Sequence, residues 1–467
     1  MERKKTNNIA IKSKKLQISL FHKKHIFGKN TCKSECIDFE TMSDLEWHCT
    51  KCELKSGQAK TWQIDRDENE IQLVNNEKGL YYNKQKQKLG QFFTTNVDYI
   101  LSGFENFIYN KNIIDPFCGN QDLLKWAIKN KAKSIKGYDV DERYIDNNLV
   151  FLNDSLKNPL EYDFVLTNPP YLYKSKMKNS EIFKGTNNTD LYQLSLEKVM
   201  NSNEGIVIVP VNFLSAENAK YIREKFFSKF DIKYCRYFTQ QVFNDTTYNV
   251  IAFYYTKKNM NSDKETFILN IQPDNIEKEI TIYKEYNWQI GGEFLNLINS
   301  QRNILNVKRL LIDDIKDGNN EINVAINHLK DTTKIKVDLK TLNVVKNNII
   351  LLKAIDTGRD TGRICLENIK KYNLDCLLSL TSSRNQIFLV FQDKLDIQEQ
   401  EQIIKLFNKE LNEKREQYFS LFMTNFRDNN RKRISFDFVY KLINYIYFNK
   451  IKGENNEKQY SLFEAIN

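Results

Sequence analysis

The segment Asn168-Pro169-Pro170-Tyr171 combines residues that could activate a weakly nucleophilic nitrogen. The exocyclic amine of a nucleobase has its lone pair delocalised into the ring, and two acceptors that grip its hydrogens favour a more tetrahedral nitrogen. An asparagine oxygen and a carbonyl held rigid by consecutive prolines provide such acceptors. The tyrosine offers a face for an extruded base, a contact that contributes about 1–3 kcal/mol per base. The alternative interpretation is a Pro-Pro turn that ends an apolar strand.

Two carboxylates follow apolar runs further upstream. Asp115 ends one run, and Asp139 lies 24 positions later (139 − 115) at the end of a second. In a doubly wound sheet, an acid at the second position can accept hydrogen bonds from both hydroxyls of a ribose, and Asp141 is the competing choice. No histidine lies between His48 and His328. Catalysis in this stretch therefore uses no imidazole base, and the reaction either needs no strong base or relies on carboxylates or amides.

Short apolar runs alternate with helical periodicity from residue 89 to about 257. This alternation predicts an α/β fold with a doubly wound, mostly parallel sheet that binds ligands beyond the carboxyl ends of its strands. The predicted strands are Asn112–Asp115, Ser134–Val140, Asp163–Thr167, Gly205–Val211, Ile232–Phe238 and Asn249–Thr256. The predicted helices are Asp122–Asn130, Asp190–Asn201, Ser215–Lys229, Asp396–Phe419 and Ser435–Asn449.

The order of these motifs resembles that of amino-methylating DNA methyltransferases of the gamma, N6-adenine group, as found in type II restriction–modification systems. Residues 90–95 (GQFFTT) are similar to the family's GQFFTP segment, with Thr95 in place of the proline. Residues 115–119 (DPFCG) resemble its cofactor loop, although Gln121 stands where the family often has glycine. The resemblance covers about residues 88–257 and implies a seven-stranded, Rossmann-like methyltransferase sheet.

The same resemblance implies S-adenosylmethionine as the cofactor and a flipped base as the acceptor. Asp154 would contact the adenine amine of the cofactor, and Phe243 would pack on the base, although Phe243 also suits a plain core position. The implied cofactor-binding residues are Gln91, Phe93, Thr94, Asp115, Pro116, Gly119, Asp139, Asp154 and Asn168. The implied catalytic residues are Asn168, Pro169, Pro170, Tyr171 and Phe243.

The resemblance favours a site-specific DNA adenine-N6 methyltransferase, the protective methylase of a restriction–modification system whose cognate endonuclease acts separately. Methylation of cytosine N4, of an RNA guanine amine or of a protein glutamine amide is the alternative, because each acceptor is a conjugated amine. An alternative of another class is a non-catalytic DNA-binding specificity protein with a decayed methyltransferase core.

The net charge of +10 suits a polyanionic partner, here double-stranded DNA, although a bias toward lysine would give the same charge on solvated faces. By resemblance, a catalytic domain at 89–260 precedes an α+β target-recognition domain at 261–467. The predicted DNA contacts are Arg384, Arg427, Arg431, Lys432 and Arg433. No apolar stretch reaches the ~20 residues of a membrane span and no secretory signal is recognisable, so we expect no membrane partner and a cytoplasmic location.

Residues 1–88 form a basic N-terminal module that carries two cysteine pairs. Cys32 and Cys36 form the first pair, and Cys49 and Cys52 form the second. Two close thiol pairs in a cytosolic protein favour a structural, tetrahedral Zn²⁺ site over disulfides. His48 is an alternative fourth ligand, and four free thiols are the alternative interpretation.

Overall fold

The computed structural model describes residues 94–177, 180–243, 248–355, 364–392, 395–425 and 432–453, together with four two-residue strands near the N-terminus. Those strands form two antiparallel pairs, β1 (Ile26–Phe27) with β2 (Asn30–Thr31) and β3 (His48–Cys49) with β4 (Leu54–Lys55). The chain divides into two compact units, Met1–Leu89 and Gly90–Asn467. Cys32, Cys36 and Cys52 lie outside the described residues, and only the backbone of Cys49 is described, so the zinc site stays a prediction.

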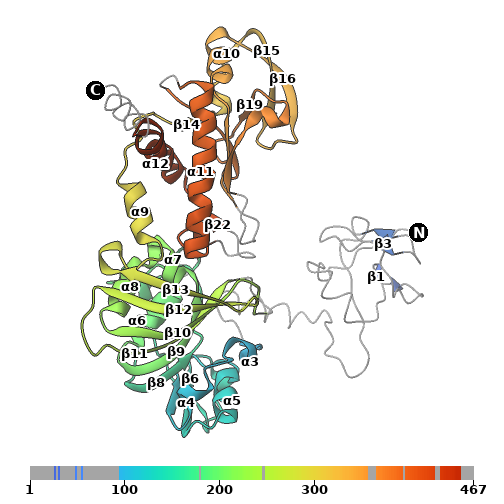
Figure 1. The fold of residues 1–467 in the computed structure, drawn as a ribbon. Coiled ribbons are helices and arrows are strands. Elements are labelled where there is room, and N and C mark those ends of the chain that lie inside the picture. The colour runs from blue at the N-terminus through green and yellow to red at the C-terminus, as the bar shows by residue number, and fades with distance from the viewer. Residues whose placement is uncertain are drawn as a thin grey trace, which may run out of the picture. The chain divides into compact units, whose positions relative to one another are not determined.

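A nine-stranded mixed sheet dominates the second unit (Figure 1). Its strand order is β13-β12-β10-β11-β9-β8-β5-β6-β7. The five strands β9, β8, β5, β6 and β7 run parallel, and β11 is antiparallel to both of its neighbours. The bounds are β5 (Asn112–Asp115), β6 (Ser134–Asp139), β7 (Val150–Leu152), β8 (Tyr162–Thr167), β9 (Ser202–Pro210), β10 (Phe230–Phe238), β11 (Val250–Lys257), β12 (Lys264–Gln272) and β13 (Ile276–Tyr283).

The predicted α/β fold with a largely parallel sheet is confirmed, but the predicted count of seven strands is wrong. Strands β12 and β13 add two members, because β12 pairs in parallel with β10 and β13 pairs with β12. Both strands follow residue 260, so the predicted boundary between the catalytic and target-recognition domains falls within this sheet. Alternating burial along β12 leaves one of its faces to solvent, and this polar alternation hides the strand among the Lys- and Asn-rich residues that follow.

Helices connect the strands and pack against the sheet. Burial of Leu123, Leu124, Trp126 and Ala127 defines the inner face of α5, as expected for an amphipathic helix beside a parallel sheet. The helices of this part are α3 (Val97–Ile100), α4 (Glu105–Ile108), α5 (Asp122–Lys129), α6 (Leu191–Lys198), α7 (Asn212–Ser215), α8 (Lys220–Phe227) and α9 (Gly292–Asn299). The short 3₁₀ helices are η1 (Glu142–Tyr144), η2 (Lys174–Lys176), η3 (Glu181–Phe183), η4 (Glu217–Ala219) and η5 (Lys284–Tyr286).

The C-terminal part combines two small sheets with three longer helices. Strands β14 (Lys308–Arg309), β20 (Gln386–Val390), β17 (Ile350–Lys353) and β18 (Cys365–Asn368) form one sheet. Strands β16 (Thr332–Val337), β15 (Asp317–Ile326) and β19 (Cys376–Leu378) form the other, and β21 (Thr424–Asn425) pairs with β22 (Lys432–Arg433). The helical elements are α10 (Leu339–Lys346), α11 (Ile397–Tyr418), α12 (Phe436–Ile446), the 3₁₀ helices η6 (Ile312–Asp314) and η7 (Ile369–Tyr372), and the π-helical η8 (Tyr447–Ile451).

The two predicted C-terminal helices are confirmed, and side chains fix where they begin. Asp396 caps α11 by accepting a hydrogen bond from the Glu399 backbone, and the Glu399 side chain accepts one from the Asp396 backbone, which forms a capping box. Ser435 caps α12 by accepting from the Phe438 backbone. Asp396 and Ser435, which open the two predicted ranges, are thus the N-cap residues of these helices.

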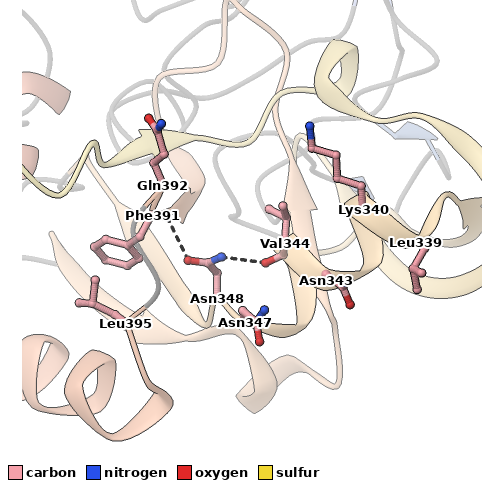
Figure 2. A pocket seen from close by; sticks show the side chains of 9 residues that line it. All are labelled: Leu339, Lys340, Asn343, Val344, Asn347, Asn348, Phe391, Gln392 and Leu395. Atoms are coloured by element: carbon pink, nitrogen blue, oxygen red, sulfur yellow. Dashed lines mark hydrogen bonds between the residues drawn. The ribbon is translucent and has the colours of Figure 1, made fainter.

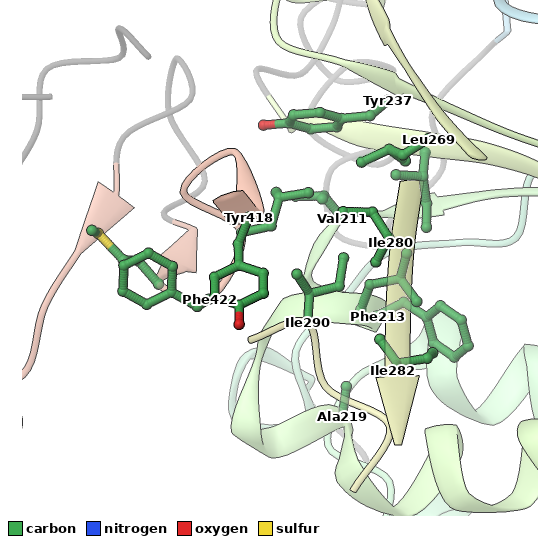
Figure 3. Packing of buried hydrophobic residues seen from close by; sticks show 14 of the residues in the cluster. Val211, Phe213, Ala219, Tyr237, Leu269, Ile280, Ile282, Ile290, Tyr418 and Phe422 are labelled. Atoms are coloured by element: carbon green, nitrogen blue, oxygen red, sulfur yellow. The ribbon is translucent and has the colours of Figure 1, made fainter. Parts of the chain in front are cut away.

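One hydrophobic cluster runs from the large sheet to α11 and α12. At the contact, Tyr418 and Phe422 lie beside Ile290 and Val211 (Figure 3). Gly291 permits this approach, because it has a φ of +66° and an added Cβ would lie 2.7 Å from Cβ of Phe422. The C-terminal end of α11 and the residues that follow it thus pack against the part of the chain that holds the large sheet. In the part of the chain that the structure describes, no helix has the length and apolarity needed to cross a bilayer.

Candidate active site

The site is built where the parallel strands β5, β6 and β8 end. Asp115 closes β5 and is 1% exposed. Its Oδ1 accepts hydrogen bonds from Thr167 Oγ1 at 2.7 Å and from the Phe117 backbone at 3.1 Å. Its Oδ2 is buried and has no hydrogen-bond partner. Burial raises the pKa of Asp115 to about 7, against the lowering effect of the two hydrogen bonds.

Asp139 ties the next strand end to the loop after β5. Its Oδ2 accepts from the Gly119 backbone and its Oδ1 from the Asp141 backbone, both at 2.8 Å. Burial raises the pKa of this carboxyl as well. The competing acid, Asp141, bonds instead to Arg143, whose Nε donates to it at 2.8 Å. The geometry therefore favours Asp139 over Asp141 as the acid at the strand end.

The loop of residues 116–121, which resembles the family's cofactor loop, has two residues in the left-handed backbone conformation. Gly119 has a φ of +46° and Gln121 a φ of +66°. Gln121 thus adopts the backbone conformation that glycine would supply at the position where the sequence departs from the family pattern. Its Nε2 donates to Asp146 at 3.1 Å, and three backbone N–H groups that also donate to Asp146 lower the pKa of that carboxyl to about 2. The substitution leaves the turn of the loop intact.

Asn168 follows β8 directly and is nearly buried, at 9% exposure. Its Nδ2 donates to Thr94 Oγ1 at 3.0 Å, and its Oδ1 accepts from the Tyr171 hydroxyl. The Tyr171 hydroxyl also lies 2.8 Å from the carbonyl of Ile208 on β9. The Asn168 amide therefore joins Thr94 to the loop after β8, and the Tyr171 hydroxyl joins the same loop to β9. Thr94 is the one residue of the predicted GQFFT cofactor contacts that is described, because Gln91 and Phe93 lie outside the described residues.

An aromatic cluster surrounds Tyr171, which is 2% exposed. Its ring meets those of Tyr192, Phe243 and Tyr248 edge to face, with centroids 5.8–6.4 Å apart. Phe243 comes to Tyr171 from 72 positions away (243 − 171), which places the two predicted base-stacking residues together. Both rings are buried in this conformation. Tyr192 and Tyr248 were not predicted, because an isolated tyrosine carries no sequence signal for such a long-range contact.

Asp190 holds the Asn-Pro-Pro-Tyr loop in place. Its Oδ1 accepts from the Leu172 backbone at 3.0 Å, and its side chain caps α6. A β-bridge between Tyr173 and Asp190 closes the same loop. The sequence offered a signal for this residue, since an aspartate before a helical pattern is a typical N-cap. Asp190 and Thr167 are thus supporting residues that the motif-based prediction missed.

The Asp154 side chain bonds to the turn that follows it. Its Oδ1 accepts from the backbones of Leu156 and Lys157, and its Oδ2 lies 3.0 Å from Lys157 Nζ. The predicted contact with the adenine amine of a cofactor would add to these bonds. The site residues on the proline-rich segments, Pro116, Pro169 and Pro170, lie in the loops after β5 and β8.

The predicted DNA contacts fall in different environments. Arg384 is exposed, and its Nη1 donates to the carbonyls of Thr381 and Ser383. Lys432 was expected to contact DNA but is 3% exposed, and its Nζ donates to the Tyr237 hydroxyl at 3.0 Å. A lysine buried against a tyrosine of the large sheet in this way is not available to phosphate. Arg433 is half-buried in β22, and Arg427 and Arg431 lie outside the described residues.

A pocket of about 580 Å³ lies elsewhere, between α10 and the residues after β20 (Figure 2). Asn348 closes one side, because its Oδ1 accepts from the Phe391 backbone and its Nδ2 donates to the Val344 carbonyl. Exposed amides of Asn343 and Gln392 border the opening. The sequence analysis assigned none of these residues, since scattered amides in an Asn-rich chain form no recognisable motif.

The carboxylates and backbone groups at the strand ends fit S-adenosylmethionine. The buried Asp115 Oδ2 is an acceptor with no hydrogen-bond partner. A buried carboxylate is costly when no cation lies near it, and a cationic ligand would remove that cost. The tight loop at Gly119 brings backbone beside Asp139, as binding to a ribose-bearing ligand requires. Among the described residues, no group of three His, Cys, Asp or Glu side chains could hold a metal ion.

Known proteins place the chain in a family. One solved structure that it resembles is the type IIG restriction endonuclease BpuSI, with 10% sequence identity, a TM-score of 0.39, and coverage of 78% of this chain and 59% of that chain. The type I EcoKI M protein has 14% identity and a TM-score of 0.32, with coverage of 46% of this chain and 54% of that chain. The type I methyltransferase subunit from Streptococcus thermophilus has 16% identity and a TM-score of 0.28, with coverage of 39% of this chain and 48% of that chain. The chain spans about half the length of these type I subunits. No curated protein matches it. The model of the Eco57I restriction-modification methylases matches residues 6–243, 238 of the 467 positions (243 − 6 + 1), so the chain belongs to the Eco57I restriction-modification methylase family.

Proposed function

We propose that this protein is an S-adenosylmethionine-dependent DNA methyltransferase that methylates the N6 amine of a flipped adenine, and that it is the protective methylase of a restriction–modification system. The observation that carries the proposal is the Asn168 amide. It is held on both ends directly after β8, on the edge of the sheet where Asp115 presents an unpartnered oxygen. Membership of the restriction-modification methylase family supports the same reaction.

The residues that would hold the cofactor line the ends of β5, β6 and β8 and the loops that follow. Bound S-adenosylmethionine supplies an electrophilic methyl group on a sulfonium. The Asp115 carboxylate is placed to accept a cationic group of such a ligand, which would lower its raised pKa again. Asp139 would hold the ribose hydroxyls through lone pairs left by its two backbone bonds. The remaining contacts that we propose are Gln91, Phe93, Thr94, Pro116, Gly119, Asp154 and Asn168.

Asn168 and Pro169 would act on the acceptor. The Asn168 oxygen and the Pro169 carbonyl would accept the two hydrogens of the target amine, which keeps its lone pair directed at the methyl carbon. Pro170 stiffens that carbonyl. The carbon–nitrogen bond would form as the bond from the methyl carbon to the sulfonium sulfur breaks. The nitrogen would then be acidic and lose a proton to water, so the step needs no histidine. Orientation and electrostatics supply the rate enhancement.

Admission of a base requires the aromatic cluster to open. Tyr171 and Phe243 are buried against each other, and the Tyr171 hydroxyl donates a hydrogen bond to the Asn168 side-chain oxygen. An adenine that enters would displace this hydroxyl and stack on the freed ring face. The cost of breaking the ring contacts disfavours any ligand that cannot donate an amine hydrogen to Asn168 in return.

DNA binding would fall to the C-terminal part and to the flanking basic residues. Arg384 is exposed and suits a contact with phosphate or guanine, while Arg427, Arg431 and Arg433 remain proposals. The domain division at 88 and 260, the zinc site at the four N-terminal cysteines, a separate cognate endonuclease and a cytoplasmic location belong to the same proposal.

The test is Asn168→Ala with methyl transfer to unmodified bacterial DNA as the readout. We expect wild-type protein to produce N6-methyladenine and the variant to lose at least about 100-fold in kcat, because an acceptor aimed at the transition state is removed. Asn203→Ala, an exposed residue of β9, is the matched control and should keep full activity. Wild-type DNA without methylated adenine, or an Asn168→Ala variant with near-normal turnover, would refute the proposal.

A further inference from the structure

We propose that the pocket between α10 and the residues after β20 binds one nucleotide, with contacts to its base and to its phosphate. The pocket has a volume of about 580 Å³, which lies within the range of small-molecule sites in proteins. It shares no lining residue with the site at the ends of β5, β6 and β8. This binding goes beyond the proposed methyl transfer and can be measured without it.

Two buried amides hold the walls of this pocket in place. Asn348 follows α10 and is 4% exposed, and its Oδ1 accepts from the Phe391 backbone at 3.0 Å (Figure 2). Gln400 lies on α11 and is fully buried, and its Nε2 donates to the carbonyls of Asn347 at 2.7 Å and Leu395 at 3.2 Å. These bonds connect the end of α10 to the segments opposite it, so the pocket is formed before a ligand arrives.

The lining combines an apolar surface with exposed amides. Val344, Phe391 and Leu395 supply the apolar part, on which the face of a planar base can pack. Asn343 on α10 and Asn347, its C-cap, are four residues apart on one helical face, and both are exposed. Each amide carries donors and an acceptor, as the edge of a nucleobase does. The two amides can therefore bind the edge of a base whose face lies on the apolar surface.

The charge of the lining favours an anionic ligand. None of the nine described residues that line the pocket is acidic, and Lys340 on α10 is exposed. Asp338 and Asp396, which lie close to the lining residues in the sequence, accept backbone hydrogen bonds as the N-caps of α10 and α11. A lysine ammonium binds phosphate as a point charge. A nucleotide combines the planar face, the edge with donors and acceptors, and the phosphate that this lining fits.

The same chemistry belongs to a free nucleotide and to a nucleotide unstacked from a DNA strand. Thymidine monophosphate is the probe for the first source, and a short oligothymidylate strand is the probe for the second. Thymine has no exocyclic amine for Asn168 to bind and differs from the adenosine part of S-adenosylmethionine, so the probes avoid the proposed active site. Equilibrium dialysis of the full chain should give one thymidine monophosphate per chain, with a Kd below about 1 mM.

The amide contacts are tested by Asn343→Leu and Asn347→Leu, which keep the size of the side chain and remove its polar groups. We expect each variant to raise the Kd for thymidine monophosphate at least about 10-fold, because a hydrogen bond to the base is lost in a partly enclosed site. Asn296→Leu is the matched control, since Asn296 is an exposed residue of α9 outside the lining, and its Kd should stay within about 2-fold. An unchanged Kd in both pocket variants would place the bound nucleotide elsewhere and overturn the proposal.

The phosphate contact is tested by comparing thymidine monophosphate with thymidine. The natural chain should bind the monophosphate about 2- to 5-fold more tightly, which is the contribution of an exposed ion pair. Lys340→Ala should abolish this difference, whereas Lys346→Ala, an exposed lysine of the same helix outside the lining, should keep it. A difference that persists in Lys340→Ala would overturn the assignment of the phosphate to this lysine.

The oligothymidylate strand distinguishes the two sources. A strand that binds at least about 10-fold more tightly than the monophosphate and is weakened by Asn343→Leu identifies a nucleotide within DNA, because neighbouring phosphates add contacts. Equal affinities identify a free nucleotide. If neither probe binds at about 10 mM, the pocket is no nucleotide site. Methyl transfer to unmodified bacterial DNA, measured in parallel on the natural chain, tests the proposed function separately, so either proposal can fail while the other stands.

Discussion

The two ends of the large sheet both bury carboxylates, but they treat them differently. At the carboxyl ends of the parallel strands, Asp115 and Asp139 are buried, and among the described residues no lysine or arginine forms an ion pair with either. At the amino ends, where β10 and β12 begin, Asp231 and Glu265 face a lysine. Lys258 Nζ lies 3.5 Å from Asp231 and 3.8 Å from Glu265.

The lysine at the amino end is itself enclosed. Its side chain is 4% exposed, and its Nζ lies 4.9 Å from the centre of the Trp288 ring, within range of a cation–π interaction. At this end, lysines of the chain itself face the carboxylates. Under the proposed function, the charge at the carboxyl end is left for a ligand to balance. A buried carboxylate without a cation then marks the end of the sheet where the ligand binds.

The largest expected effect comes from removing the balancing charge. Lys258→Ala removes the lysine that faces the buried Glu265 and the half-buried Asp231, and Asp231 keeps its ion pair with Lys233. We expect a loss of about 3 kcal/mol in the free energy of unfolding at pH 8, because Glu265 is left without a cation. Burial raises the pKa of Glu265 to about 7, above its unfolded value, so protonated Glu265 favours folding at low pH and this contribution is lost as pH rises through 7. The loss caused by Lys258→Ala should therefore be smaller at pH 5.

Urea unfolding followed by fluorescence measures this change, and Trp288 beside the lysine reports on it directly. Lys257→Ala is the control, because the neighbouring lysine is exposed and bonds only at the surface to Asn203. It should change stability by less than about 0.5 kcal/mol. Equal losses in the two variants would show that the amino-end cluster balances no charge that matters to folding.

The second prediction concerns the unbalanced end. The raised pKa of Asp115 means that its carboxyl favours folding below about pH 4 and that this advantage is lost as the pH rises through about 7. Asp115→Asn removes the ionisation but keeps an oxygen for Thr167 and Phe117. Relative to the natural chain, the variant should gain about 2 kcal/mol in stability between pH 5 and pH 8, while its affinity for S-adenosylmethionine falls.

Urea midpoints of both chains at the two pH values measure this gain. Asp163→Asn, an exposed aspartate on β8, is the matched control and should show no comparable gain. If the stability difference between the natural chain and Asp115→Asn is the same at both pH values, ionisation of Asp115 does not destabilise the fold. The contrast between the two ends of the sheet then disappears.

The sequence was most informative where one local rule decided the structure. Five of the predicted strands lie within about two residues of β5, β6, β8, β10 and β11, because short apolar runs between turn residues leave few alternatives. The positions of Asp115, Asp139 and Asn168 at strand ends followed from the same pattern. Their convergence on one edge followed from parallel pairing.

Residues whose environment depends on distant partners could not be predicted. Lys432 looks like a DNA-contacting lysine within a basic run, yet it is buried on Tyr237, nearly 200 positions earlier (432 − 237 = 195). Thr94 and Tyr171 belonged to motifs, but their shared hold on Asn168 depends on how two segments pack. Amphipathic strands such as β12 also escape recognition, because about half of their residues are polar.

The smallest expected effect tests whether Gln121 weakens the carboxyl end of the sheet. At a φ of +66°, a side chain with a Cβ costs about 1 kcal/mol relative to glycine, and the bond from Gln121 Nε2 to Asp146 offsets part of that cost. Gln121→Gly should therefore change the free energy of unfolding by less than about 1 kcal/mol and leave the Kd for S-adenosylmethionine within about 2-fold.

Gln121→Val, a β-branched residue in a left-handed conformation, should destabilise by about 2 kcal/mol and weaken cofactor binding by distorting the loop. A glycine variant that binds the cofactor at least 10-fold more tightly would mean that Gln121 holds this loop away from its binding geometry. The carboxyl end would then be a partly decayed site, and the unpartnered oxygen of Asp115 a remnant of one, rather than an acceptor kept for a ligand.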